Sequence, residues 1–255
     1  MKLKKLSSYG LPQAAVRAIQ KDMIEMGFLE LPGPPLGLGG PKTESGWFRF
    51  NGKSGPDAAD PPDSQLLVHL TMDTAERFVG LREVRPNARW DDPSTDGEDA
   101  ALSNELRALM QPSPWKDGWA YCAAFAEGVV MEALRLGDFS VETQSRFSEL
   151  MSPHCVTSAN NFGRIDLLRE EPAIGSIWLG RWGSGSSGHC GLVRSIDGPM
   201  MGTIEANTSG GEEAAEFTAK DREGDWIDRK RRHINRNGNL QTLGFVHLED
   251  IAKLS

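Results

Sequence analysis

The stretch Gly118-Trp-Ala-Tyr-Cys-Ala-Ala-Phe125 is the starting point for the fold. It opens an apolar segment, residues 120–136, that is rich in Ala, Val, Met and Leu and stops at Gly137, a pattern typical of a buried helix. Cys122 falls in the first turn of that helix, where unpaired backbone N–H groups and the positive end of the helix dipole favour a thiolate. A thiolate is the form in which cysteine acts as a nucleophile. The alternative for a single free cysteine is a small buried core residue.

The segments around this helix predict the fold class. We expect further helices at 13–27, 66–84, 99–110 and 141–151, the last of them capped by Ser140. Short apolar runs between Gly, Asp-Gly and Asn-Gly turns predict strands at 174–179, 190–196, 200–206 and 243–248. Helices followed by strands indicate an α+β fold, with helices packed on an antiparallel sheet.

Composition divides the chain into two parts. Residues 31–40 are rich in Pro and Gly, and residues 51–64 consist largely of Gly, Pro, Asp and Ser, which is typical of a linker. We therefore place a small helical module at 8–52, a linker at 53–65 and a larger domain at 66–255.

Charge and cysteine content exclude several functions for a chain of 255 residues. The net charge of −8 argues against a nucleic-acid partner, and no apolar run is long enough for a membrane span. Met1–Lys5 is basic but lacks the apolar stretch of a signal peptide, so we expect synthesis in the cytoplasm without Sec export. The three cysteines (Cys122, Cys155 and Cys190) form no C-x-x-C pair, which predicts neither a metal site nor a disulfide framework, and we expect no cofactor.

A second chemical feature follows a glycine- and serine-rich loop at 183–188. His189 starts the apolar run His189-Cys-Gly-Leu-Val193, so it has an exposed edge at the beginning of a strand. A histidine there can take a proton from a thiol and later give it to a leaving amine. The alternative is a surface histidine without a role.

A third feature lies on the next predicted strand, Thr203-Ile-Glu-Ala-Asn-Thr208. Strand alternation places Glu205 and Asn207 on one face. If this strand pairs with the strand of His189 through the Asp197-Gly198 turn, either side chain can reach the imidazole and fix its orientation. The alternative is two polar groups on a solvated face.

Taken together, these segments resemble the CHAP family of cysteine- and histidine-dependent amidohydrolases and peptidases, papain-like enzymes that cleave peptidoglycan. The resemblance covers roughly residues 66–250. It rests on Tyr121-Cys-Ala-Ala-Phe125, Pro172-Ala-Ile-Gly-Ser-Ile-Trp178, Gly188-His-Cys-Gly-Leu-Val193, Ile204-Glu-Ala-Asn-Thr208 and an upstream helix and loop at 75–87. The sequence departs from the family pattern at Tyr121, where tryptophan is usual, at Ser176, where aspartate is commoner, and at Cys190, where an apolar residue is usual.

The resemblance implies a papain-like catalytic domain and a role for each matched residue. Cys122 attacks an amide carbonyl, His189 protonates the leaving amine, and Glu205 orients His189. Asn207 is the alternative third member or a substrate contact. We expect Cys190 to point into the core, with a second thiol near the site as the alternative.

Aromatic residues around these segments are candidates for a substrate groove. The candidates are Trp119, Tyr121 and Trp182, whereas Trp178 is expected in the core.

The N-terminal segment is similar to a small helical peptidoglycan-binding domain. The similarity spans residues 8–52 and rests on Val16, Ile19, Gln20 and Met23, followed by Gly27. The alternative is a helical hairpin that packs on the larger domain.

These features predict a peptidoglycan hydrolase that cuts an amide bond, as an N-acetylmuramoyl-L-alanine amidase or a stem-peptide endopeptidase. Without a signal peptide, it reaches the wall by another route. It is either a phage lysin released by a holin or an antibacterial effector, with an immunity protein and a secretion-machine component as partners. The rival hypotheses are a non-catalytic wall-binding protein and a cysteine deamidase or transglutaminase-like toxin with a cytosolic protein substrate.

Two charged segments have simpler interpretations. The acidic segment Asp92–Glu98 begins like a calcium loop, but Ser103 stands where the bidentate glutamate is needed, so a solvated loop is expected. The basic run Arg229-Lys-Arg-Arg232 is expected to be an exposed turn or the edge of a strand.

Overall fold

The computed structural model describes residues 64–81, 100–116, 119–209 and 226–254, together with Val16, Gln20, Lys21 and Ile24. These four N-terminal positions are helical. The rest of the predicted module at 8–52, the linker up to residue 63 and the acidic segment at 92–98 lie outside the described residues.

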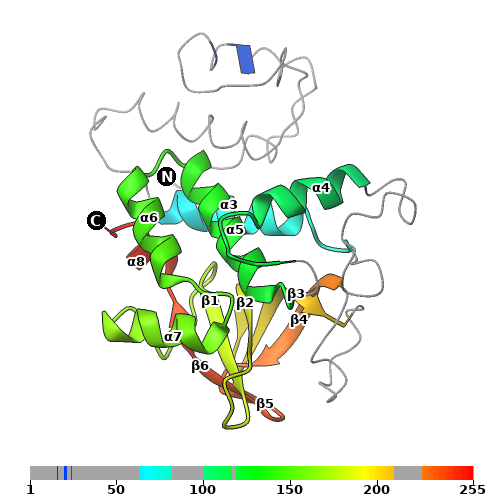
Figure 1. Cartoon of the computed structure of the whole chain (residues 1–255), viewed down its shortest axis with the longest axis vertical. Coiled ribbons are helices and arrows are strands. Elements are labelled where there is room, and N and C mark those ends of the chain that lie inside the picture. The colour runs from blue at the N-terminus through cyan, green and yellow to red at the C-terminus, as the bar shows by residue number, and fades with distance from the viewer. Residues whose placement is uncertain are drawn as a thin grey trace.

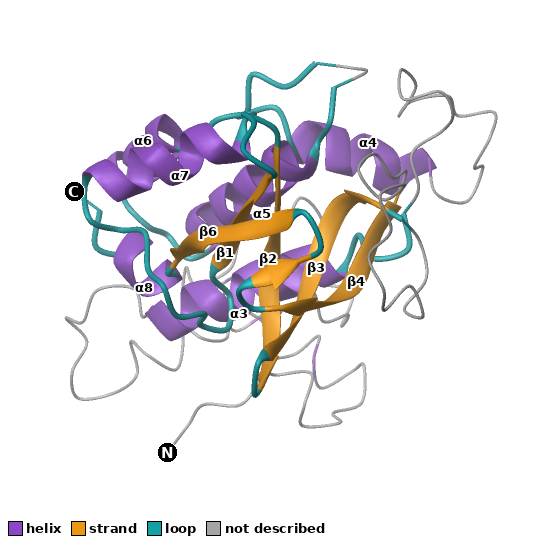
Figure 2. Cartoon of the chain, turned by 90° about the horizontal axis from the view of Figure 1, so that it is seen from below, coloured by secondary structure: helices purple, strands orange, loops and turns teal. Residues whose placement is uncertain are grey.

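A six-stranded antiparallel sheet forms one half of the domain. Its strands are β1 (Ile177–Trp182), β2 (Gly188–Asp197), β3 (Met200–Thr208), β4 (Trp226–His233), β5 (Arg236–Asn237) and β6 (Leu240–Val246). They lie in the order β4-β3-β2-β1-β6-β5. The sheet curls strongly enough for its two edge strands, β4 and β5, to contact each other (Figure 2).

Helices form the other half of the domain (Figure 1). They are α3 (Ser64–Glu76), α4 (Ala100–Leu109), α5 (Cys122–Leu136), α6 (Val141–Leu150), α7 (Cys155–Arg164) and the short α8 (Leu248–Ile251). Helix α5 is central, because it packs against β2 and β3 on one side and against α3, α4 and α6 on the others. The predicted α+β class is confirmed.

Burial explains why the segment after Tyr121 becomes the central helix. Twelve of the fifteen residues of α5 are buried, so its apolar sequence faces protein on nearly every side. Small residues allow this crowding: a Cβ on Gly128 would lie 2.4 Å from the backbone oxygen of Leu109. Phe125 packs edge-to-face on Phe78, with ring centroids 6.3 Å apart.

A second, smaller cluster of buried side chains belongs to the sheet. Its members come from four strands and are Trp178, Val193, Met201, Leu240 and Phe245. Because side chains alternate along a strand, these residues lie on the face opposite to the main core, inside the curl of the sheet. This face also carries the polar groups described below.

The structure corrects some predicted boundaries and adds elements. The helix expected at 66–84 ends at Glu76, because the chain turns at Gly80 (φ 91°) and pairs with the start of β4. Gly80 N donates to Ile227 O at 2.8 Å, and Ile227 N donates to Leu81 O at 2.9 Å. Helix α7 was not predicted. Strand β4 was predicted only for its basic run, as one of two alternatives, because its mostly charged sequence shows no clear hydrophobic period.

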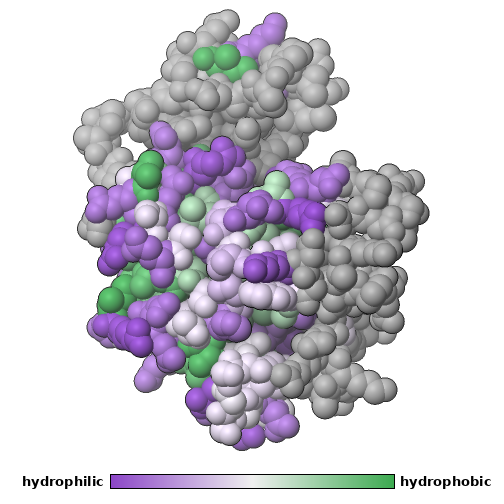
Figure 3. Space-filling model, in the orientation of Figure 1, coloured by the Kyte–Doolittle hydropathy of each residue, from purple (hydrophilic) through white to green (hydrophobic). Residues whose placement is uncertain are grey.

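No helix in the described part of the chain is both long and apolar enough to cross a membrane. On the face shown in Figure 3, hydrophobic residues form small groups between hydrophilic ones. Among the described residues, the large hydrophobic side chains that remain exposed are Ile24, Trp119, Val141, Ile165, Ile174 and Ile196.

Candidate active site

Cys122 is the first residue of α5, as the sequence predicts. The preceding residue, Tyr121, makes no side-chain hydrogen bond to cap the helix. The first-turn N–H groups of α5 therefore have no side-chain cap from that position, and the dipole of a 15-residue helix acts on the thiol. Only 4% of Cys122 is exposed.

His189 and Glu205 lie side by side on the neighbouring strands β2 and β3. His189 Nε2 is 2.8 Å from Glu205 Oε2. The register places Leu192 opposite Ile204, and a Cβ on Gly191 would lie 2.6 Å from Glu205 Cγ. Gly191 therefore leaves the space that the Glu205 side chain occupies on its way to the imidazole.

Glu205 is fully buried and holds a complete set of hydrogen bonds. Its Oε1 accepts from Thr203 Oγ1 at 2.5 Å and from Arg232 Nε at 2.8 Å. Its Oε2 accepts from Arg232 Nη2 at 2.6 Å and contacts His189 Nε2. Four partners match the four lone-pair positions of a carboxylate, which leaves Glu205 little freedom to rotate. The guanidinium of Arg232 also lies 6.0 Å from the ring centroid of Trp178, which packs edge-to-face on His189.

The ionisation of these groups follows from their contacts. Burial raises the pKa of Glu205, but the charge and hydrogen bonds of Arg232, with those of His189, outweigh burial and hold it well below its usual range. Burial lowers the pKa of His189, but its contacts with Cys122 and Glu205 outweigh burial and raise that pKa to about 9. Since Glu205 occupies Nε2 of the ring, Nδ1 is left for the thiol.

The pKa of Cys122 is held well below its usual range. The largest cause is a hydrogen bond with Cys155, followed by one with Cys190, and His189 adds a hydrogen bond and a positive charge. Burial opposes these effects without cancelling them. The favoured state is a thiolate at Cys122 beside an imidazolium at His189. Arg232, Glu205, His189 and Cys122 then form a chain of alternating charge that is neutral overall.

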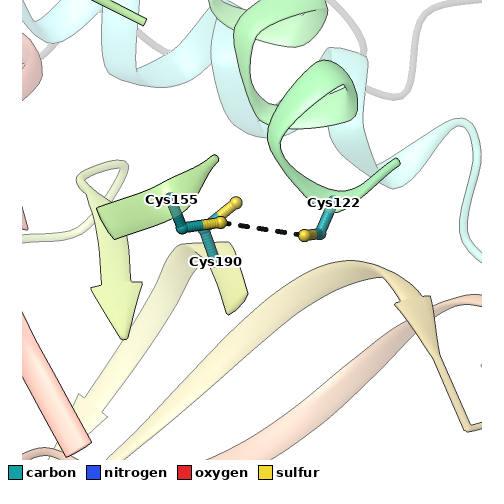
Figure 4. Close-up of side chains that lie close together, drawn as sticks. All are labelled: Cys122, Cys155 and Cys190. Carbon is teal, nitrogen blue, oxygen red and sulfur yellow. Dashed lines mark hydrogen bonds between the residues drawn. The ribbon is translucent and has the colours of Figure 1, made fainter. Parts of the chain in front are cut away.

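The structure brings the other two cysteines to the same place. Cys155 is the first residue of α7, and its Sγ lies 3.8 Å from Cys122 Sγ. Cys190 follows His189 on β2, and the three Sγ atoms all lie within 4.8 Å of one another (Figure 4). Cys190 is completely buried in the main core and is also a thiol near the site, so both of its predicted positions hold. Sequence spacing did not predict this cluster, because its members are 33 and 35 residues apart.

Asn207 lies at an irregularity of β3. The register of β3 and β4 shifts between Ala206 and Thr208, and Asn207 adopts a φ of +58°. Its Oδ1 is buried and has no hydrogen-bond partner among the described residues. Glu205 is therefore the residue that contacts His189, and the bulge breaks the alternation that predicted both side chains on one face.

The predicted groove residues occupy three different environments. Trp119 is 45% exposed just before α5, with the Lys116 ammonium 5.7 Å from its ring centroid. Trp182 is half-buried at the end of β1. Tyr121 is fully buried in the main core, and this corrects the expectation that its ring lines a groove. Trp178 lies in the core as predicted.

The basic run at 229–232 forms part of the edge strand β4, as one of the two interpretations predicts. Its exposure differs from the prediction, because Arg232 and Lys230 are buried and only Arg231 is largely exposed. The alternation of a strand explains the difference: Arg232 lies opposite Met201 and faces the inside of the curl.

Comparisons with protein-family models, with curated proteins and with solved structures find no match to this chain. The resemblance to the CHAP family and to a peptidoglycan-binding domain therefore stays a prediction that rests on the motifs themselves. The arrangement of Cys122, His189, Glu205 and Arg232 is observed in this chain and is not compared with a relative.

Proposed function

We propose that this protein is a cysteine hydrolase that cleaves an amide bond of peptidoglycan. One observation carries the proposal: His189 Nε2 lies 2.8 Å from the buried carboxylate of Glu205, and His189 is close enough to Cys122, at the N-terminus of α5, for the two to shift each other's pKa. A nucleophile, a base and a group that orients the base are the three parts that thiol-dependent acyl transfer needs.

The proposed reaction has two halves. In the first, the Cys122 thiolate attacks the amide carbonyl, and a C–S bond forms. The C–N bond then breaks, the leaving amine takes the proton of His189, and a thioester remains on Cys122. In the second half, His189 takes a proton from water, and the hydroxide attacks the thioester. The C–S bond then breaks, Cys122 returns to the thiolate, and the product leaves as a carboxylic acid that gives its proton to solvent.

The remaining residues position these groups. Glu205 holds the Nε2–H of His189, so that Nδ1 faces the thiol, and Arg232 fixes Glu205 in that orientation. The backbone N–H of Cys122, at the positive end of α5, is the donor that we assign to the oxyanion formed during the attack. Arg232 touches no reacting atom and is a positioning residue.

Peptidoglycan is proposed as the substrate because two sequence resemblances point to it separately. One is the set of motifs around Cys122, His189 and Glu205, and the other is the wall-binding pattern at 8–52. The bond is either N-acetylmuramoyl–L-alanine or an amide of the stem peptide. The enzyme acts on the wall as a phage lysin or as an effector delivered to a rival cell.

Digestion of purified sacculi tests this proposal. The wild type should release amines without new reducing ends, and mass spectrometry of the products then names the bond. Cys122→Ala and His189→Ala should each abolish the release. His154→Ala is the matched control, because His154 is exposed beside Cys155 and should leave the rate unchanged.

Other outcomes of the digestion overturn the proposal. Reducing ends in place of amines would mean cleavage of the glycan. If the wild type binds sacculi of several chemotypes but releases nothing, the chain is a wall-binding protein. If it neither binds nor cuts them, the hypothesis of a toxin with a cytosolic protein substrate takes its place.

A further inference from the structure

Three thiols from three separate elements meet at one point of the core. Cys122 comes from α5, Cys155 from α7 and Cys190 from β2, and their side chains converge in Figure 4. All three cysteines are free and buried. The proposed hydrolysis needs only one of these thiols, so the other two call for a separate explanation.

The distances between the sulfur atoms match those of a bound metal ion. In a tetrahedral zinc site with Zn–S bonds of about 2.3 Å, neighbouring sulfur atoms lie roughly 3.8 Å apart. Cys122 Sγ and Cys155 Sγ are 3.8 Å apart. No pair in the cluster exceeds 4.8 Å, so side-chain shifts of roughly 1 Å or less would complete the triangle.

Two of the three cysteines stand at the N-termini of helices. Cys122 and Cys155 are each the first residue of a helix, and neither helix has a side-chain cap. Two helix N-termini therefore direct their positive ends at the same group of thiols.

Gly188 allows helix α7, which carries Cys155, to lie close to the hairpin of β1 and β2. A Cβ on Gly188 would lie 3.0 Å from Cys155 Cβ and 2.5 Å from the backbone oxygen of Gly180. Only a residue without a side chain lets the start of α7 approach the β1–β2 hairpin so closely. The sequence around His189 thus makes room for Cys155 as well as for Glu205.

We propose that Cys122, Cys155 and Cys190 form a binding site for a single thiophilic metal ion, with zinc as the probe. On binding, the thiols of Cys155 and Cys190 release their protons to solvent, whereas Cys122 is already a thiolate. Three thiolates then donate to the metal, and a water molecule completes the tetrahedral coordination. Thiolate ligands favour zinc over magnesium or calcium, which prefer oxygen.

The site has a consequence that rests on the proposed function. A metal ion held by Cys122 occupies the nucleophile, so zinc should inhibit amide hydrolysis reversibly. The wild type should lose hydrolysis as the site fills and recover it when a chelator removes the metal.

A zinc titration of the full-length, untagged chain tests the site without reference to hydrolysis. The protein is kept reduced with a phosphine, and zinc is partitioned between the protein and a chromophoric chelator. We expect one zinc per chain. Cys155→Ala and Cys190→Ala should each weaken binding by at least about 100-fold, beyond the 10- to 100-fold typical of losing an outer partner. His154→Ala, which removes an exposed imidazole next to Cys155, should bind zinc like the wild type.

A second measurement needs no substitution and so does not depend on how the variants fold. Zinc should protect all three cysteines of the wild type from iodoacetamide, as peptide mapping would show. Binding that survives both cysteine substitutions, or three thiols that react at the same rate with and without zinc, would overturn the site.

The zinc titration and the digestion of sacculi test two separate claims, the metal site and the proposed function. Zinc bound at one per chain by a protein that cuts no sacculus would leave the site standing and remove the proposed function. Hydrolysis that continues at full rate with the site saturated would overturn the inhibition.

Discussion

Replacing Arg232 by methionine removes one cation from a buried group of charges while keeping much of the volume of the side chain. In the structure, Arg232 forms two hydrogen bonds with Glu205, at 2.8 Å and 2.6 Å, and 5% of its side chain is exposed. After the substitution, Glu205 keeps His189 and Thr203, but half of its lone-pair positions lose their partner.

Removing one partner of a buried ion pair costs about 3–5 kcal/mol of the free energy of unfolding, because the other charge stays buried. For a domain of about 150–250 residues, this corresponds to a fall in Tm of roughly 6 to 20 °C. The loss should also depend on pH. Glu205 has a lowered pKa in the folded state, so its contribution to stability is present above about pH 4.3 and is lost as the pH falls. Without Arg232, that contribution shrinks, and the variant should differ most from the wild type at neutral pH.

Urea unfolding and thermal melting, at pH 7 and at pH 4, measure these changes. Arg231→Met is the matched control, because Arg231 precedes Arg232 on β4 but is 60% exposed and pairs with Asp197 at 3.4 Å. A surface pair of this kind should contribute less than about 1 kcal/mol. Equal losses for the two variants, or a loss below about 1 kcal/mol for Arg232→Met, would refute the reasoning.

Three further predictions concern the same group of residues. Gly191→Ala adds a methyl group 2.6 Å from Glu205 Cγ and should slow hydrolysis of sacculi at least about 10-fold. Gly163→Ala is the control and should not slow it, because a methyl group there would have no neighbour closer than 4.0 Å. Equal rates for the two variants would contradict the role given to Gly191. Glu205→Gln keeps the shape but removes the charge, and should lower the rate at least about 100-fold, as rate assays at saturating substrate would show. The rate of the wild type should fall as pH rises through about 9, where His189 loses the proton that the leaving amine needs; a rate that still rises at pH 10 would contradict this ionisation.

Stability should follow the ionisation of His189 in the opposite sense to that of Glu205. A raised histidine pKa contributes stability that is fully present below about pH 6.5, the usual value, and is lost as pH rises through about 9. The free energy of unfolding, measured by urea from pH 6 to pH 10, should therefore decline across that window.

The sequence predicts those parts of the site that depend on local patterns. Cys122 could be placed at the start of a helix because the following residues are almost uniformly apolar. His189 and Glu205 could be placed on paired strands because a short Asp-Gly turn joins two runs with clear alternation. Their hydrogen bond also depends on Gly191, which leaves room for the side chain of Glu205.

The parts that sequence reasoning missed depend on long-range packing. Arg232 reaches Glu205 from 27 residues away, on an edge strand whose sequence is mostly charged, so no hydrophobic period marks it as buried. Cys155 reaches Cys122 from 33 residues away, at the start of a polar helix. The available signal was weak: two glycines, Gly188 and Gly191, flank the His189-Cys190 pair, and both leave room for side chains from other elements.

Site-specific alkylation of the wild type by iodoacetamide tests the central claim, that Cys122 is an activated nucleophile, most directly. At pH 6, peptide mapping should show that Cys122 reacts before Cys155 and Cys190, because its pKa is held low while theirs are raised, chiefly by their contacts with Cys122. Hydrolysis of sacculi should disappear in step with that single modification. If Cys122 reacts no faster at pH 6 than the cysteines of the unfolded chain, or if hydrolysis survives its complete alkylation, the claim is contradicted.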